Sequence, residues 1–167
     1  MGGYKLTGLA VGSSSGDSLA YGNTVTSTIA QKLMFSAVNS TAQTVTTGVS
    51  TMVTVAETLD PNGNFASNRH TPTVAGTYRY RGTLVVTATS VTLVDLYIYK
   101  NGASARWMAG AVPGTTNALA VAGCVDIAMN GTTDYVELFG NASGTGTVQF
   151  AGAAPSLCSF SGEYIGV

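Results

Sequence analysis

Apolar and polar side chains alternate along the segment that follows Gly76, and this alternation limits what the chain can fold into more than any other feature. The apolar positions are Tyr78, Tyr80, Leu84, Val86 and Ala88. Arginines and threonines stand between them, so the pattern has a period of two over about 12 residues. A helix would spread these positions around its axis, whereas an extended chain gathers them on one face. The segment therefore predicts a half-buried antiparallel strand.

Shorter segments repeat the alternation. Residues 33–38 and 94–99 follow it, and 119–127 does so with leucine, valine and isoleucine on one side. The opposite side of that last segment carries Ala120, Ala122, Cys124 and Asp126. Each of these segments is predicted to be a strand with one face in the core.

Turn signals separate the strands. Asn-Gly pairs at 101–102 and 130–131 favour hairpin turns. The second pair leads into a predicted strand at 135–139, and the glycine-rich stretch from Gly140 to Thr147 is predicted to be a loop. A last strand is expected at 160–165. About eight to ten strands with no helix-period segment predict an all-β protein, an antiparallel jelly-roll β-sandwich.

The composition agrees with strands and limits the partners. The chain has 24 Thr, 18 Val and 21 Gly among its 167 residues, which favours strands over surface helices. Charged residues make up 9% and the net charge is −1, so there is no basic field to attract nucleic acid. A surface so poor in charge is weakly protected against self-association. We expect it to be partly covered by its own copies or by a larger particle.

The first 30 residues differ from the rest. Residues 8–28 are rich in Gly, Ser, Thr and Asn and offer little that could form a core. The sequence thus predicts an extended amino-terminal arm at 1–30 and a sandwich domain at 31–167, with a leader of no role as the open alternative. The start of the chain lacks a secretory signal, and no stretch approaches the roughly 20 apolar residues of a membrane span. We expect a soluble chain, synthesised in the cytoplasm, with no membrane partner.

No constellation for chemistry emerges. Residues 12–16 match the G-x-S-x-G pattern but lie in low-complexity sequence, and the only histidine, His70, is expected in a loop or at a strand edge. The turn at 60–64 has the spacing of a calcium loop, yet Phe65 stands where that loop needs Gly, and Thr71 where it needs Glu. We therefore expect no enzyme, no cofactor and no metal.

Four other reactive or charged residues have simple interpretations. Cys124 and Cys158 could pair, but two free thiols are the preferred interpretation. Arg79 and Arg81 face outward, where they could meet an acidic partner or, as we favour, lie in solvent.

Several short pieces occur in a characteristic order along the chain: Lys32–Ala37, Phe65, Thr71-Pro72, Gly76-Thr77-Tyr78, Leu96–Gly102, Asn130-Gly131 with Asp134–Leu138, and Phe160-Ser161-Gly162. Together they resemble the globular head of the complement first-component q subunit, whose family shares its trimeric jelly roll with tumour necrosis factor. This chain departs from the pattern by two inserted threonines, Thr132 and Thr133, and by lacking a collagen-like stalk and a secretory signal. Similar domains without stalk or signal occur in bacteriophage virion proteins.

The resemblance implies a homotrimer with apolar side chains near its three-fold axis. The candidates for this interface are Tyr97, Tyr99, Tyr135 and Phe139. It further implies a virion structural protein, a trimeric decoration on the capsid surface whose partner is the major capsid protein or another virion protein. The arm would anchor it. Its candidate anchoring residues are Leu6, Leu9, Val11, Leu19 and Tyr21.

Two alternatives stay open. One is a tail-fibre or receptor-binding module that recognises a host surface glycan or protein. Its loops would be expected to carry aromatics, and 109–117 and 140–147 carry none. The other is a soluble complement-like adhesion head, which the missing stalk and signal disfavour.

Overall fold

The computed structural model describes residues 33–114, 116–152 and 157–166. In these ranges all regular structure is strand, and no helix there is long and apolar enough to cross a bilayer. The predicted arm at 1–30, with its anchoring residues and the G-x-S-x-G stretch, lies outside the described residues.

The described residues form twelve strands. These are β1 (Met34–Val38), β2 (Gln43–Thr44), β3 (Thr51–Met52), β4 (Ala56–Leu59), β5 (Phe65–Ala66), β6 (Arg69–His70), β7 (Gly76–Lys100), β8 (Ala103–Ala111), β9 (Thr116–Met129), β10 (Val136–Thr145), β11 (Gln149–Phe150) and β12 (Ser159–Gly166). Every pairing among them is antiparallel. The prediction of an all-β jelly roll is confirmed.

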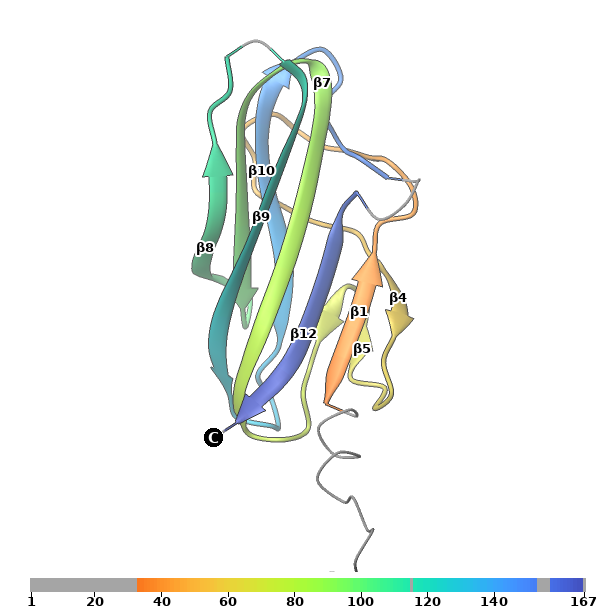
Figure 1. Cartoon of the computed structure of the whole chain (residues 1–167), viewed down its shortest axis with the longest axis vertical. Helices are drawn as coiled ribbons and strands as arrows, with labels where there is room; N and C mark the ends of the chain where they lie inside the picture. Colours follow the sequence, from red (N-terminus) through yellow and green to blue (C-terminus); the bar gives the residue numbers. More distant parts are fainter. Residues whose placement is uncertain (1–32, 115, 153–156, 167) are drawn as a thin grey trace, which may run out of the picture.

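The long strand β7 belongs to both layers of the sandwich. Its first half pairs with β9 and β12, and its second half with β8 and β10. Figure 1 shows the chain rising through the first half, bending over at the top and descending through the second. One layer is therefore β4-β1-β12-β7-β9, and the other is built on β8-β7-β10 with β3 and β6 at its far edge.

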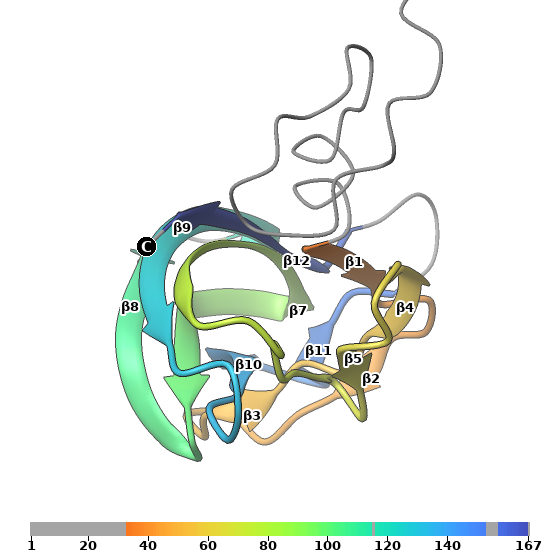
Figure 2. The same cartoon turned by 90° about the horizontal axis from the view of Figure 1, so that it is seen from below.

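The two layers enclose a single core. The inward faces predicted for β1, β7 and β9 do point inward, and the largest fully buried side chains are Tyr78, Tyr80, Phe35, Phe150, Phe160, Leu84, Leu96, Ile98 and Leu138. Seen from below, the strands curve around this core, and β8 and β9 lie side by side (Figure 2). Gly123 of β9 permits that approach, because a Cβ there would lie 2.6 Å from the carbonyl oxygen of Met108.

The prediction of a loop from Gly140 to Thr147 is wrong over most of its length, because β10 continues to Thr145. Its small residues pack the strand closely against the opposite layer. A Cβ on Gly140 would lie 2.6 Å from a Leu84 methyl group and 2.7 Å from the ring of Phe150, and Ala142 is fully buried. Glycine marks a close approach here rather than a turn.

His70 also differs from expectation. It lies in the short strand β6, as a strand-edge residue would, but its side chain is buried and only 3% exposed. Its ring stacks on Phe35 with centroids 4.4 Å apart, and its Nδ1 lies 3.1 Å from the hydroxyl of Tyr80. The imidazole is thus part of the aromatic core.

Candidate assembly and binding surfaces

The four residues predicted to line a trimer axis gather on the outward surface of the β8-β7-β10 layer. Tyr97 lies opposite Phe139 in the strand register, and the rings of Tyr99 and Phe139 are stacked with centroids 3.9 Å apart. Tyr135 precedes β10, and the Arg69 guanidinium lies 3.7 Å above the centre of its ring. We call Tyr97, Tyr99, Trp107, Tyr135 and Phe139 the aromatic face. Its role as the trimer interface stays a prediction.

Trp107 is the member of this face that sequence reasoning missed. Counted from the Asn-Gly turn, an uninterrupted hairpin would place Trp107 opposite Leu96, on the buried side. One register shift in the β7–β8 pairing, between Tyr99 and Ile98, places it opposite Tyr97 instead. Its side chain is 59% exposed, and its indole N–H donates a hydrogen bond to Oδ1 of Asp95 at 3.0 Å. Nothing local in the sequence marks this bulge.

Polar groups border the aromatic face at both ends. Asn141 lies opposite Asp95 in the register, so both side chains belong to the outward side, next to Tyr97. At the other end Arg69 forms an ion pair with Glu137, whose side chain is 8% exposed, at 2.8 Å. That arginine is therefore neutralised within its own chain.

The outward side of the other layer has a different character. Along β9 the outward positions from Ala118 to Ala122 are alanines, and all of them are exposed. Ala120 and Ala122, together with Thr83, Val85 and Leu157, line a shallow and mostly apolar hollow. We call Val85, Ala118, Ala120, Ala122 and Leu157 the alanine face. The sequence had placed Ala120 and Ala122 outward, but it gave them no role.

Ion pairs border the alanine face. Arg79 holds Asp126 through two hydrogen bonds of 2.8 and 2.9 Å, and Arg81 contacts Glu163 at 2.6 Å. The contact with Arg79 lowers the pKa of Asp126. Both arginines thus have partners on neighbouring strands of the same chain, in solvent, which leaves little attraction for an acidic partner.

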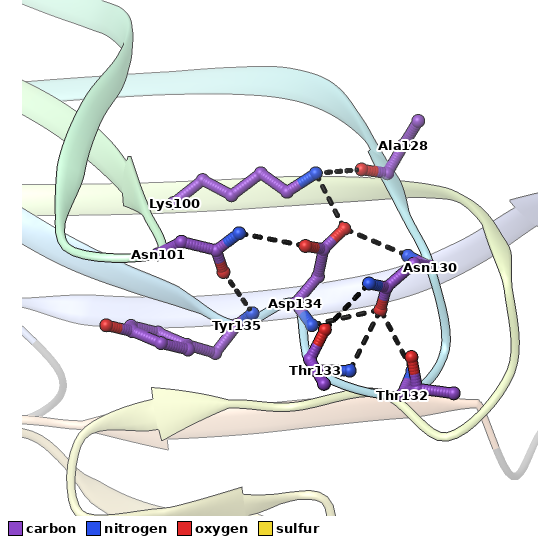
Figure 3. Close-up of polar contacts among 8 residues, drawn as sticks. All are labelled: Lys100, Asn101, Ala128, Asn130, Thr132, Thr133, Asp134 and Tyr135. Atoms are coloured by element: carbon purple, nitrogen blue, oxygen red, sulfur yellow. Dashed lines mark hydrogen bonds and ion pairs between the residues drawn. The ribbon is translucent and has the colours of Figure 1, made fainter.

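A polar cluster fixes the lower end of the aromatic face (Figure 3). The Asp134 carboxylate accepts hydrogen bonds from the Asn101 amide at 2.8 Å and the Asn130 N–H at 3.0 Å, and it lies 2.7 Å from Lys100 Nζ. The Asn101 and Lys100 contacts lower its pKa. The side-chain oxygen of Asn101 accepts a hydrogen bond from the backbone N–H of Tyr135. The cluster therefore ties the β7–β8 turn to the start of β10.

The inserted threonines are accommodated inside this cluster. The Asn130 side-chain oxygen accepts the N–H groups of Thr132, Thr133 and Asp134 at 2.9, 3.0 and 3.0 Å. One asparagine thus caps the whole turn, and the carboxylate still reaches its partners. The departure from the family pattern changes the turn without removing its anchor.

The turn at Asp60 and the two cysteines were the candidates for a metal site and a disulfide. Asp60 accepts the Phe65 N–H on its carboxylate at 2.7 Å and the Gly63 N–H on its carbonyl, so it stabilises its own turn. Among the described residues no three His, Cys, Asp or Glu side chains cluster in a way that could hold a metal ion. Cys124 and Cys158 are unpaired, the first exposed and the second buried.

The fold is that of the C1q and tumour necrosis factor jelly rolls. The structure is similar to the globular domain of zebrafish complement 1qA protein, with a TM-score of 0.55 and 16% identity over 80% of this chain and 98% of that one. It is also similar to murine APRIL, with a TM-score of 0.52 and 10% identity over 79% of this chain and 98% of that one. No protein-family model matches the chain, and no curated protein does. At such identities the likeness shows the fold alone.

Proposed function

We propose that this chain is a structural protein that assembles as a homotrimer through the alanine face and decorates the capsid surface of a bacteriophage. It is not an enzyme in this proposal. Its proposed function is to form a rigid trimer that residues 1–30 attach to the particle. The fold and the low charge of the chain support the proposal, and the resemblance to trimeric heads favours three copies.

The main support for the proposed assembly is the exposed apolar surface of the alanine face. An antiparallel sheet that faces water on one side places polar residues outward, yet Ala118, Ala120 and Ala122 occupy those positions. Leu157, which is 37% exposed, extends the same apolar strip. Small side chains allow a second sheet or edge to approach closely, and the bordering ion pairs supply a polar rim. Exposed without a partner, this strip would promote aggregation.

The test of assembly is the mass of the particle in solution. Light scattering on the full chain at micromolar concentration should give about 51 kDa, three times the 16.9 kDa of one chain. Ala122→Arg should give monomers, because it places an unpaired charge in the apolar contact. Ala56→Arg is the matched control, since Ala56 is also exposed but lies on the edge strand β4, and it should remain trimeric.

A monomeric wild-type chain would overturn the proposed assembly. So would a trimer that survives Ala122→Arg and is broken by Tyr99→Arg, which would transfer the interface to the aromatic face predicted from the sequence. Near-ultraviolet circular dichroism of each variant checks that a loss of mass is not a loss of fold.

The virion part of the proposal has its own test. Quantified by mass spectrometry on purified particles, the chain should be comparable in abundance to the major capsid protein. Deleting residues 1–30 should leave the trimer folded and abolish particle binding, because identical weak contacts from three arms add through avidity. A few copies per particle would favour a tail component, and retained binding by the truncated chain would remove the anchoring role.

A further inference from the structure

The aromatic face has the organisation of a ligand platform. Trp107, Tyr97 and Phe139 lie opposite one another on the three adjacent strands β8, β7 and β10. Neighbouring strands are about 4.8 Å apart, so the row extends about 10 Å across the sheet. Tyr99 stacks on Phe139 beside it. The row lies on the layer opposite the alanine face.

The rings are held in place before any ligand arrives. Asp95 fixes the indole of Trp107 through the 3.0 Å hydrogen bond, although that indole is more than half exposed. Gly110 makes room for it, because a Cβ there would lie 2.9 Å from the indole ring. Fixed rings lose little conformational entropy when a ligand stacks on them.

Hydrogen-bonding groups lie directly beside the rings. Asp95 and Asn141 are opposite one another, in the row next to Tyr97 and Phe139. The side-chain oxygen of Asn141 is buried without a hydrogen-bond partner among the described residues, and an acceptor left unpaired in this way is unfavourable. A ligand hydroxyl that donates a hydrogen bond to it would remove this penalty.

We infer that the aromatic face binds a neutral carbohydrate. A pyranose ring presents C–H groups, which pack on the electron-rich face of an aromatic ring, and hydroxyls at its rim, which pair with carboxylate and amide groups. A row of three rings bordered by Asp95 and Asn141 offers both. An acidic sugar is disfavoured, because Asp95 repels it and Glu137 already neutralises Arg69. This inference goes beyond the structural role and does not depend on the trimer.

The single tryptophan of the chain makes the site directly measurable. A glycan array carrying neutral and sialylated glycans identifies the ligands, and lactose, maltose, cellobiose and sialyllactose are then titrated against the full chain. Neutral sugars should change Trp107 emission saturably, and sialyllactose should bind more weakly than lactose. Tyr97→Ala keeps the reporter and should weaken binding about tenfold, a loss of about 1.4 kcal/mol. Val112→Ala, which truncates a side chain 78% exposed beyond the end of β8, is the matched control and should bind normally.

Several results would overturn the inference. They are binding of no neutral glycan on the array, equal binding of sialyllactose, and normal affinity in Tyr97→Ala. A change of Trp107 emission on dilution of the sugar-free chain would instead assign the face to contacts between copies. The monomeric Ala122→Arg variant separates this inference from the proposed assembly, because it should retain the affinity of each site for lactose or the array ligand.

Discussion

The Nδ1 atom of His70 lies 3.1 Å from the hydroxyl oxygen of Tyr80, inside a cluster of Phe35, Phe65 and Tyr78. Burial lowers the pKa of this imidazole from 6.5 to about 4, against a smaller opposing effect of Asp60. The folded protein therefore holds a neutral histidine at pH values where the unfolded chain protonates it.

This burial predicts a loss of stability in weak acid. Between pH 6.5 and about 4 the unfolded state binds a proton that the folded state does not, so the free energy of unfolding falls as the pH falls. Each pKa unit corresponds to about 1.4 kcal/mol, so the full loss is about 3 kcal/mol. Urea denaturation at a series of pH values measures it. His70→Gln should flatten the profile over this window, and an unchanged slope in that variant would refute the assignment.

The Asp134 cluster should contribute more to stability than the exposed ion pairs. Asp134→Asn places an amide N–H group where the carboxylate now accepts hydrogen bonds from Asn101, Asn130 and Lys100. We expect a loss of about 1–3 kcal/mol, seen as a lower melting temperature. The control is Asp126→Asn, which breaks the solvent-exposed pair with Arg79 and should cost clearly less. Equal losses would mean that the cluster adds nothing to an ordinary surface contact.

Gly140 should resist substitution although it carries no unusual backbone angle. Gly140→Ala forces a methyl group against Leu84 and Phe150, which we expect to cost about 1–3 kcal/mol in chemical denaturation. Gly114→Ala is the matched control, because a Cβ there has nothing within 4 Å, and it should be neutral or slightly stabilising. A neutral Gly140→Ala would show that the two layers are less closely packed at this point than the structure has them.

The local sequence pattern was sufficient to predict much of this fold. The alternation in β1, β7 and β9 correctly assigned inward residues such as Phe35, Tyr80 and Leu96, because a strand has only two faces and one of them must be buried. The Asn-Gly pair at 101–102 correctly predicted a turn, because both residues adopt positive φ there, 54° and 80°. Whether a segment forms a strand, and which of its residues share a face, depends largely on residues close together in the chain, so the sequence shows both.

Contacts between distant segments decided the rest. Gly140 belongs to a strand because Leu84 and Phe150 lie against it, and His70 is buried because Phe35 and Tyr80 enclose it. Trp107 faces outward because one bulge shifts β8 along β7 by a residue, and a shift of one residue exchanges the two faces of a strand. Local sequence therefore predicted the long strands, their hairpin turns and most of the inward side chains. The continuation of β10 to Thr145, the burial of His70 and the side chains that meet on the two outward faces follow from tertiary contacts, because register and layer packing depend on partners that no local pattern contains.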